Sequence, residues 1–104
     1  MNNEFKEQKL IGQYFHSYIL DDATGRLEVH NQGCIEGKVT DEVYICQLFS
    51  FVSGAETNSI VVHVKDMKDW RFYRTAEEMR NYYEQYQIGY DARLEESRKL
   101  LENS

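Results

Sequence analysis

The chain has 104 residues, of which 41% are hydrophobic and 29% charged, values typical of one globular domain rather than a disordered chain. Its formal net charge of −6 disfavours general binding to the phosphate backbone of nucleic acids. No stretch is apolar enough for a signal peptide or a membrane span, and Cys34 and Cys46 form no Cys-x-x-Cys motif. We therefore expect a cytoplasmic protein with no membrane association, whose cysteines are buried thiols rather than a disulfide.

The first two thirds of the sequence show the two-residue period of β-strands. Residues 1–9 are mostly polar and are expected to form a flexible tail. Turn-forming residues then separate five strands, and Gly33 and Gly37 are candidates for bulges or sharp bends. The expected strands are Leu10–Leu20, Arg26–Asn31 with a continuation over Cys34–Val39, Val43–Val52, Ser59–Val64 and Trp70–Tyr73. A single helical turn is expected at Lys65–Asp69, before the last strand.

The second strand has the most regular alternation. Leu27 and Val29 alternate with Arg26, Glu28 and His30, so the pattern predicts one buried face and one solvated face.

The last third has the period of a helix. Thr75 and Glu78 form a capping box, and apolar residues then recur every three or four positions as far as Leu101. The pattern predicts a C-terminal helix over about residues 75–102. A break at Gly89 is as consistent with the sequence as one continuous helix. The overall prediction is a single α+β domain over 1–104, with a β-barrel or curled sheet over about 10–74 and the helix over 75–104.

This order of elements resembles the SH3-like and Tudor-like small β-barrels. The resemblance rests on Gly37-Lys38-Val39, on Val43-Tyr44-Ile45, and on Val62–Asp66 leading into Trp70-Arg71-Phe72. It covers about half of the chain and implies a five-stranded antiparallel barrel. The segment Asp66-Met67-Lys68-Asp69-Trp70 is also similar to segments of uncharacterised short bacterial proteins, a resemblance that implies no function.

Groups that could support catalysis or metal binding are scattered along the chain. His16, His30 and His63 come from three different strands and match no local zinc motif. Cys34 has acidic neighbours, Cys46 has apolar ones, and neither setting favours a thiolate. We expect no enzyme, no metal and no cofactor.

The sequence favours a non-catalytic module that binds another macromolecule, most simply a protein, or that self-associates as a homodimer. Aromatic residues make up 13% of the chain, and tyrosine offers both an apolar face and a polar group. A narrow helical stripe cannot bury all the tyrosines after residue 80, so some are free for a partner. The candidate binding residues are Trp70, Arg71, Tyr73, Arg74, Tyr82, Tyr86 and Tyr90.

Two alternatives remain open. The basic and aromatic residues of 65–74 could bind nucleic acid by stacking and by phosphate contacts. An acidic inhibitor that mimics phosphates, as some mobile-element proteins do, would instead use the acids of the first half, namely Asp21, Asp22, Glu28, Glu36, Asp41 and Glu42. The sequence specifies neither the partner nor the biological process, nor whether Cys34 and Cys46 are close in space.

Overall fold

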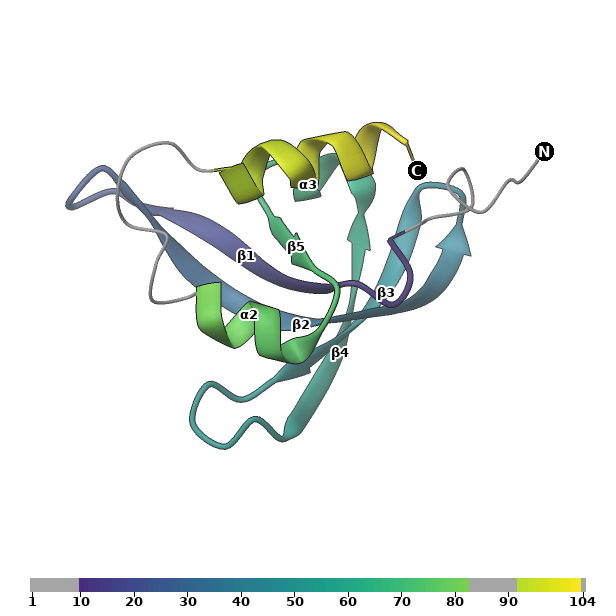
Figure 1. Ribbon diagram of the computed structural model, residues 1–104, viewed down its shortest axis with the longest axis horizontal. Helices are drawn as coiled ribbons and strands as arrows, with labels where there is room; N and C mark the ends of the chain where they lie inside the picture. Colours follow the sequence, from purple (N-terminus) through teal and green to yellow (C-terminus); the bar gives the residue numbers. More distant parts are fainter. Residues whose placement is uncertain (1–9, 83–91, 104) are drawn as a thin grey trace.

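The computed structural model describes residues 10–82 and 92–103, which form a five-stranded antiparallel sheet, a 3₁₀ turn and two α-helices (Figure 1). The strands are β1 (Tyr14–Asp21), β2 (Arg26–Thr40), β3 (Val43–Phe49), β4 (Glu56–His63) and β5 (Arg71–Tyr73). The 3₁₀ turn is η1 (Val64–Met67), and the helices are α2 (Ala76–Tyr82) and α3 (Ala92–Glu102).

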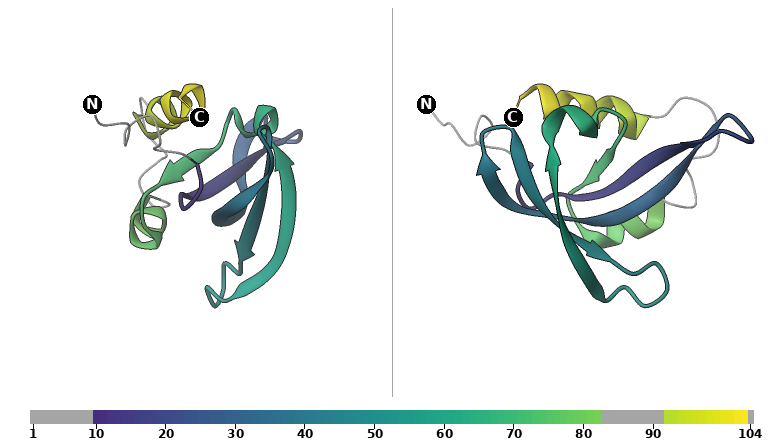
Figure 2. Two further views of the ribbon diagram at one scale, coloured as in Figure 1. Left: turned by 90° about the vertical axis from the view of Figure 1, so that its right-hand side faces the viewer. Right: turned by 180° about the vertical axis from the view of Figure 1, so that it is seen from behind.

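The strand order in the sheet is β4-β3-β2-β1-β5, and every neighbouring pair is antiparallel. The first four strands form a meander, and β5 pairs with the free side of β1. The sheet is strongly curled, as Figure 2 shows from two sides. The predicted curled sheet and the helical turn before β5 are confirmed. Because β4 and β5 lie at opposite edges, the sheet is not closed, and an SH3-like barrel stays a prediction.

Several strand boundaries differ from the sequence prediction. Strand β2 runs unbroken from Arg26 to Thr40, without the break expected near Gly33, and β4 begins at Glu56 rather than Ser59. Two further differences arise because turns occupy positions that were expected to be strand. The first strand begins at Tyr14 rather than Leu10, because Gly12 adopts a positive φ of 92° in a turn and its amide donates to the Ile35 carbonyl at 2.7 Å. The third strand ends at Phe49 rather than Val52, because Ser50 starts a hydrogen-bonded loop.

The hydrophobic core lies on the concave face of the sheet. Opposite residues of paired strands share a face, so Phe15 lies beside both Phe72 and Gly33. The indole of Trp70 stacks on the Phe15 ring, with centroids 4.4 Å apart. The buried core residues are Leu10, Phe15, Ile35, Tyr44, Cys46, Leu48, Met67, Trp70 and Phe72, with Leu100 and Leu101 of α3 packed against them.

Helix α3 covers the free edge of β5. The Phe72 amide donates to Ser97 Oγ at 2.8 Å, and Arg93 Nη1 donates to the Phe72 carbonyl at 3.4 Å. These backbone groups point away from β1 and would otherwise lack a strand partner. The helix therefore satisfies this edge of the sheet with side chains.

Helix α2 lies on the other side of β5 from α3 (Figures 1 and 2). The predicted cap is confirmed, because the Glu78 amide donates to Thr75 Oγ1 at 3.1 Å, while the Glu78 carboxylate accepts from the Arg74 amide. For residues 75–102, where one continuous helix and a broken one were both consistent with the sequence, the structure has two helices, α2 and α3. Met79 is buried beside β1 and β5, whereas Leu100 packs on the concave core, so the apolar stripe serves two different surfaces. Gly89, the predicted break, lies outside the described residues.

The β1–β2 hairpin extends beyond the rest of the sheet (Figure 1). Leu20 and Leu27 face each other near its tip and are 56% and 42% exposed. The prediction that Leu27 belongs to a buried face is therefore wrong, because no described element packs against this part of the hairpin.

Candidate functional site

The structure places most of the predicted binding residues inside the protein. Trp70 is part of the core, and Arg71 and Tyr73 are 7% and 0% exposed. Arg74 is exposed and Tyr82 is half-buried at the end of α2, while Tyr86 and Tyr90 lie outside the described residues. The buried members of the set therefore support the fold and do not offer a contact surface in this conformation.

The most notable interior feature is a cluster of four polar and aromatic side chains, which we call the His16 cluster: His16, Tyr18, Arg71 and Tyr73. The His16 Nδ1 atom lies 2.8 Å from the Tyr73 hydroxyl oxygen, and the two rings meet edge to face. The guanidinium of Arg71 lies over the Tyr18 ring, 4.4 Å from its centroid, and also donates to the Asp69 carbonyl. The cluster occupies the sheet face that α2 covers.

Burial sets the electrostatics of this cluster. His16 is 1% exposed, and burial lowers its pKa to about 4; the nearby Arg71 charge lowers it further, while a hydrogen bond with Gln32 acts in the opposite direction. Burial likewise raises the pKa of the Tyr73 hydroxyl. Both groups are therefore neutral at pH 7. A histidine and a tyrosine could exchange a proton with a substrate, but these two are covered by the protein.

A hollow of about 570 Å³ lies between β5, the two helices and the segment before β1. Its lining mixes charges of both signs: Arg74, Arg93 and Lys99 against Glu78 and Glu96. Arg93 Nη1 lies 3.3 Å from Glu96 and 3.8 Å from Glu78, so part of this charge is neutralised within the lining. The hollow therefore lacks the concentrated positive charge that would select an anion.

The basic segment 65–74 does not present the arrangement that nucleic-acid stacking requires. Lys65, Lys68 and Arg74 are exposed, but the aromatic rings of Trp70 and Phe72 are 7% and 3% exposed. A stacking platform needs an accessible ring face beside the cations. The described segment exposes Lys65, Lys68 and Arg74 together with the acidic Asp66, without an accessible ring beside them.

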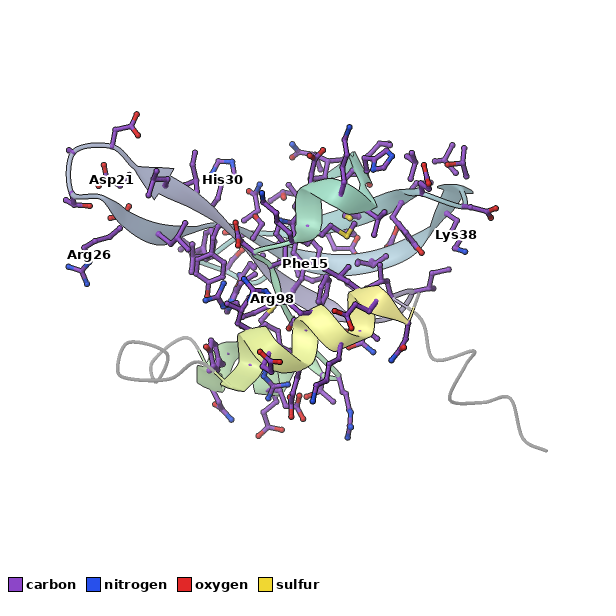
Figure 3. The ribbon with its side chains drawn as sticks, turned by 90° about the horizontal axis from the view of Figure 1, so that it is seen from above. Phe15, Asp21, Arg26, His30, Lys38 and Arg98 are labelled. Carbon is purple, nitrogen blue, oxygen red and sulfur yellow. The ribbon has the colours of Figure 1, made fainter. Side chains whose placement is uncertain are left out.

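The acidic residues of the first half do not form one continuous surface. Asp21 lies at the tip of the β1–β2 hairpin beside Arg26, whereas Asp41 and Glu42 form the turn at the other end of the fifteen-residue strand β2. Figure 3 shows this separation, with Asp21 and Arg26 at one end of the molecule and Lys38 near the other. The hypothesis of an acidic inhibitor that mimics phosphates requires a continuous negative face, and the separation of these acids weakens it.

The two cysteines are free and point to opposite faces of the sheet. Cys34 lies opposite Gln47, while its neighbour Ile35 lies opposite Cys46. Successive residues of a strand alternate between faces, so a disulfide is excluded without a shift of register. Burial raises the pKa of Cys46 to about 12, and burial followed by the Glu36 charge raises that of Cys34.

The histidines are equally dispersed. His16 is buried in its cluster, His30 is exposed on β2, and His63 Nε2 lies 3.3 Å from Glu42. Within residues 10–82 and 92–103, no three His, Cys, Asp or Glu side chains are grouped so as to hold a metal ion.

The sequence predicted a loop between the third and fourth strands at residues 53–58, but missed that the loop is Ser50–Ala55 and includes Phe51 and Val52. Ser50 Oγ accepts from the amides of Val52 and Ser53 at 3.1 and 3.2 Å. The loop exposes Val52 by 97% and Phe51 by 52%. These two residues extend the apolar pattern of the third strand, so the loop was predicted to begin only at Ser53. Ser50 is the additional turn-forming residue that could have placed its start earlier.

In the described part of the chain, no helix has the length and apolar character needed to cross a membrane. A scan against protein-family models found no match, and searches of curated proteins and of solved structures found none either.

Proposed function

We propose that this protein is a non-catalytic interaction module that binds another protein by inserting the Ser50–Ala55 loop into an apolar pocket of that partner. The single observation behind this proposal is a hydrogen-bonded loop that holds Phe51 and Val52 in solvent. The curled sheet serves as the scaffold for the loop, and its order of elements resembles that of the SH3-like small barrels.

The loop is held by backbone and side-chain hydrogen bonds together. The Ser50 amide donates to the Ala55 carbonyl and the Gly54 amide to the Ser50 carbonyl, both at 2.9 Å. The Ala55 amide donates to Ser53 Oγ at 3.2 Å, and Gly54 adopts a positive φ of 76°. A loop that is already ordered loses less conformational entropy on binding, so more of the contact energy is left for affinity.

Exposed apolar side chains carry the binding energy in this proposal. Burying a valine or phenylalanine side chain that was in water contributes roughly 1.5–3 kcal/mol. Val52 is almost fully exposed, so nearly all of its contribution is available to a partner. An apolar pocket is the complementary surface, because the loop itself, Ser50–Ala55, has no charged side chain.

The state of the interior groups supports a binding role rather than catalysis. His16 and Tyr73 are buried and neutral at pH 7, and the raised pKa of Cys46 keeps that thiol protonated. A general base or nucleophile must reach its substrate in the reactive protonation state. These three groups instead have the surroundings of structural residues.

The test compares two matched double variants with the wild-type chain. Phe51→Ser with Val52→Ser removes the apolar tip of the loop, and Ile19→Ser with Leu20→Ser removes two exposed apolar residues, 50% and 56% exposed, from the other long hairpin. Proteins recovered by affinity capture are identified by mass spectrometry, and the recovered partner is then purified and titrated by calorimetry.

The expected result is that the loop variant loses the partner, while the Ile19/Leu20 variant retains it with unchanged affinity. Equal affinity of the wild type and the loop variant for the purified partner would disprove the proposed role of the loop. Equal losses in both variants would also count against it, because they would indicate general apolar adhesion.

A further inference from the structure

The two edges of the sheet differ in how their backbone groups are satisfied. At the β5 edge, Ser97 and Arg93 of α3 occupy the outward amide and carbonyl of Phe72. At the other edge, β4 has β3 as its only strand neighbour among the described residues. The eight residues of β4 form a longer edge than the three of β5.

The hydrogen-bond pattern identifies which β4 groups point outward. The Val64 amide donates to the Glu42 carbonyl, and successive residues of an antiparallel strand alternate between its two neighbours. Val62 and Ile60 therefore direct their backbone groups to β3. Ser59 and Val61 direct theirs to the free edge, where they can receive another strand.

Side chains at this edge offer none of the usual protection against strand pairing. Residues 57–62 include no charged residue and no proline, and β4 has regular pairing with β3 from Ser59 to His63. Lysine, proline and bulges are the devices that normally block edge pairing. Val61 is 62% exposed and has the β-branched shape that strand pairing favours.

We propose that β4 pairs antiparallel with β4 of a second copy of this chain, around a two-fold axis that lies midway between the two copies of Ile60. Charge decides in favour of a second copy. Glu56 lies at one end of β4, while His63 ends the strand and Lys65 follows it in η1, so antiparallel pairing brings Glu56 near these basic residues of the other copy at both ends. A parallel arrangement would instead place Glu56 beside Glu56.

The register follows from the requirement that opposite residues share a face. With a two-fold axis normal to the sheet, one residue of β4 must then lie opposite the same residue of the other copy. Centring on Ile60 places Ser59 opposite Val61 of the other copy, and both are residues whose backbone groups point outward. It also places Glu56 opposite Val64 of the other copy, the residue between His63 and Lys65. The product is a ten-stranded sheet, with the β5 edges at its two ends.

The experiment measures the mass of the full chain by sedimentation equilibrium, from micromolar to millimolar concentration. The wild type should show up to a twofold rise in mass. Val61→Lys adds a charge at the edge and should keep the monomer mass throughout, whereas Val39→Lys, at a valine that is 56% exposed on the interior strand β2, should behave as the wild type. Ser59→Lys serves as a second edge variant if Val61→Lys does not fold.

Amide hydrogen exchange at low and high concentration locates the contact. The amides of Ser59 and Val61 should exchange more slowly as the dimer fraction rises, while those of Ile60 and Val62 should be protected at both concentrations. A constant monomer mass, a mass beyond the dimer, equal association of the Val61→Lys chain, or concentration-dependent protection confined to other strands would each overturn the proposal. The inference does not depend on the Phe51–Val52 loop, so the two proposals can fail separately.

Discussion

His16 on β1 and Tyr73 on β5 are joined diagonally across the strand pair. In the register of these strands, His16 lies opposite Arg71 and Tyr73 lies opposite Tyr14, yet the His16 Nδ1 atom is 2.8 Å from the Tyr73 hydroxyl oxygen. The contact adds a side-chain hydrogen bond to a strand of only three residues. The imidazole is neutral at pH 7, because burial and the nearby Arg71 charge lower the pKa of His16.

The first prediction is a loss of stability in acid that depends on His16. Its pKa is lowered from 6.5 to about 4 by folding, so the unfolded chain binds the proton more tightly and the folded state loses stability as the pH falls from 6.5 towards 4. The full loss is about 3 kcal/mol, at about 1.4 kcal/mol for each pKa unit. Urea unfolding at several pH values measures it.

His16→Gln should flatten this part of the pH profile, whereas His30→Gln, at an exposed position on β2, should leave it unchanged. An unaltered acid slope in the His16→Gln chain would show that other groups cause the loss.

The second prediction concerns the cover of the β5 edge. Ser97→Ala removes the acceptor of the Phe72 amide in a position that is 2% exposed, which should lower the free energy of unfolding by about 1–3 kcal/mol. Urea denaturation measures this change, and hydrogen exchange should show faster exchange at the Phe72 amide. Arg98→Ala, at the exposed next residue of α3, should change stability by no more than about 0.5 kcal/mol. Equal effects of the two substitutions would contradict the role of Ser97.

The third prediction distinguishes two glycines of β2. A Cβ atom at Gly33 would lie 2.2 Å from the Gln47 carbonyl oxygen and 2.9 Å from Cζ of Phe15, so Gly33→Ala should destabilise the fold by about 1–3 kcal/mol or more. A Cβ at Gly37 meets nothing within 4 Å, so Gly37→Ala should be neutral or stabilising. Thermal unfolding of both variants checks the difference, and a stable Gly33→Ala chain would indicate that the centre of the sheet can relax.

The fourth prediction concerns the thiols. Because burial raises the pKa of Cys46 to about 12, iodoacetamide should modify Cys46 only after unfolding. Cys34 is half-buried, and its pKa is also raised, so it should react slowly in the folded protein. Mass spectrometry of peptides after timed labelling gives both rates. An intramolecular disulfide under mild oxidation would contradict the placement of the two side chains on opposite faces.

Local patterns were sufficient to predict much of the fold. The strand that begins at Val43 and the cap at Thr75 depend on neighbouring residues, and both predictions are confirmed. The fate of Gly33 could not be predicted in the same way. It was a candidate for a bulge, but the register shifts of β2 against β3 lie between Ile35 and Gly37 and between Lys38 and Thr40. Gly33 instead makes room for the Gln47 carbonyl and the Phe15 ring.

The candidate binding surface was harder to predict, because exposure depends on which elements pack together. Trp70, Arg71 and Tyr73 look like a basic and aromatic binding segment in the sequence, but α2 and the core cover them. Phe51 and Val52 look like the end of a buried strand, but the hydrogen bonds of Ser50 turn the chain outward. Periodicity reports the local geometry of the backbone and not its distant neighbours.

The hydrogen bond between Phe72 and Ser97 also has a consequence for synthesis of the protein. Twenty-five residues separate the two groups, so β5 leaves the ribosome well before the residue that shields it. Until Ser97 is synthesised, both outer strands of the nascent sheet, β4 and β5, have a border with unsatisfied backbone groups, and not β4 alone. A pause in translation within this interval, or a truncation before Ser97, would leave a species prone to assemble through the wrong border.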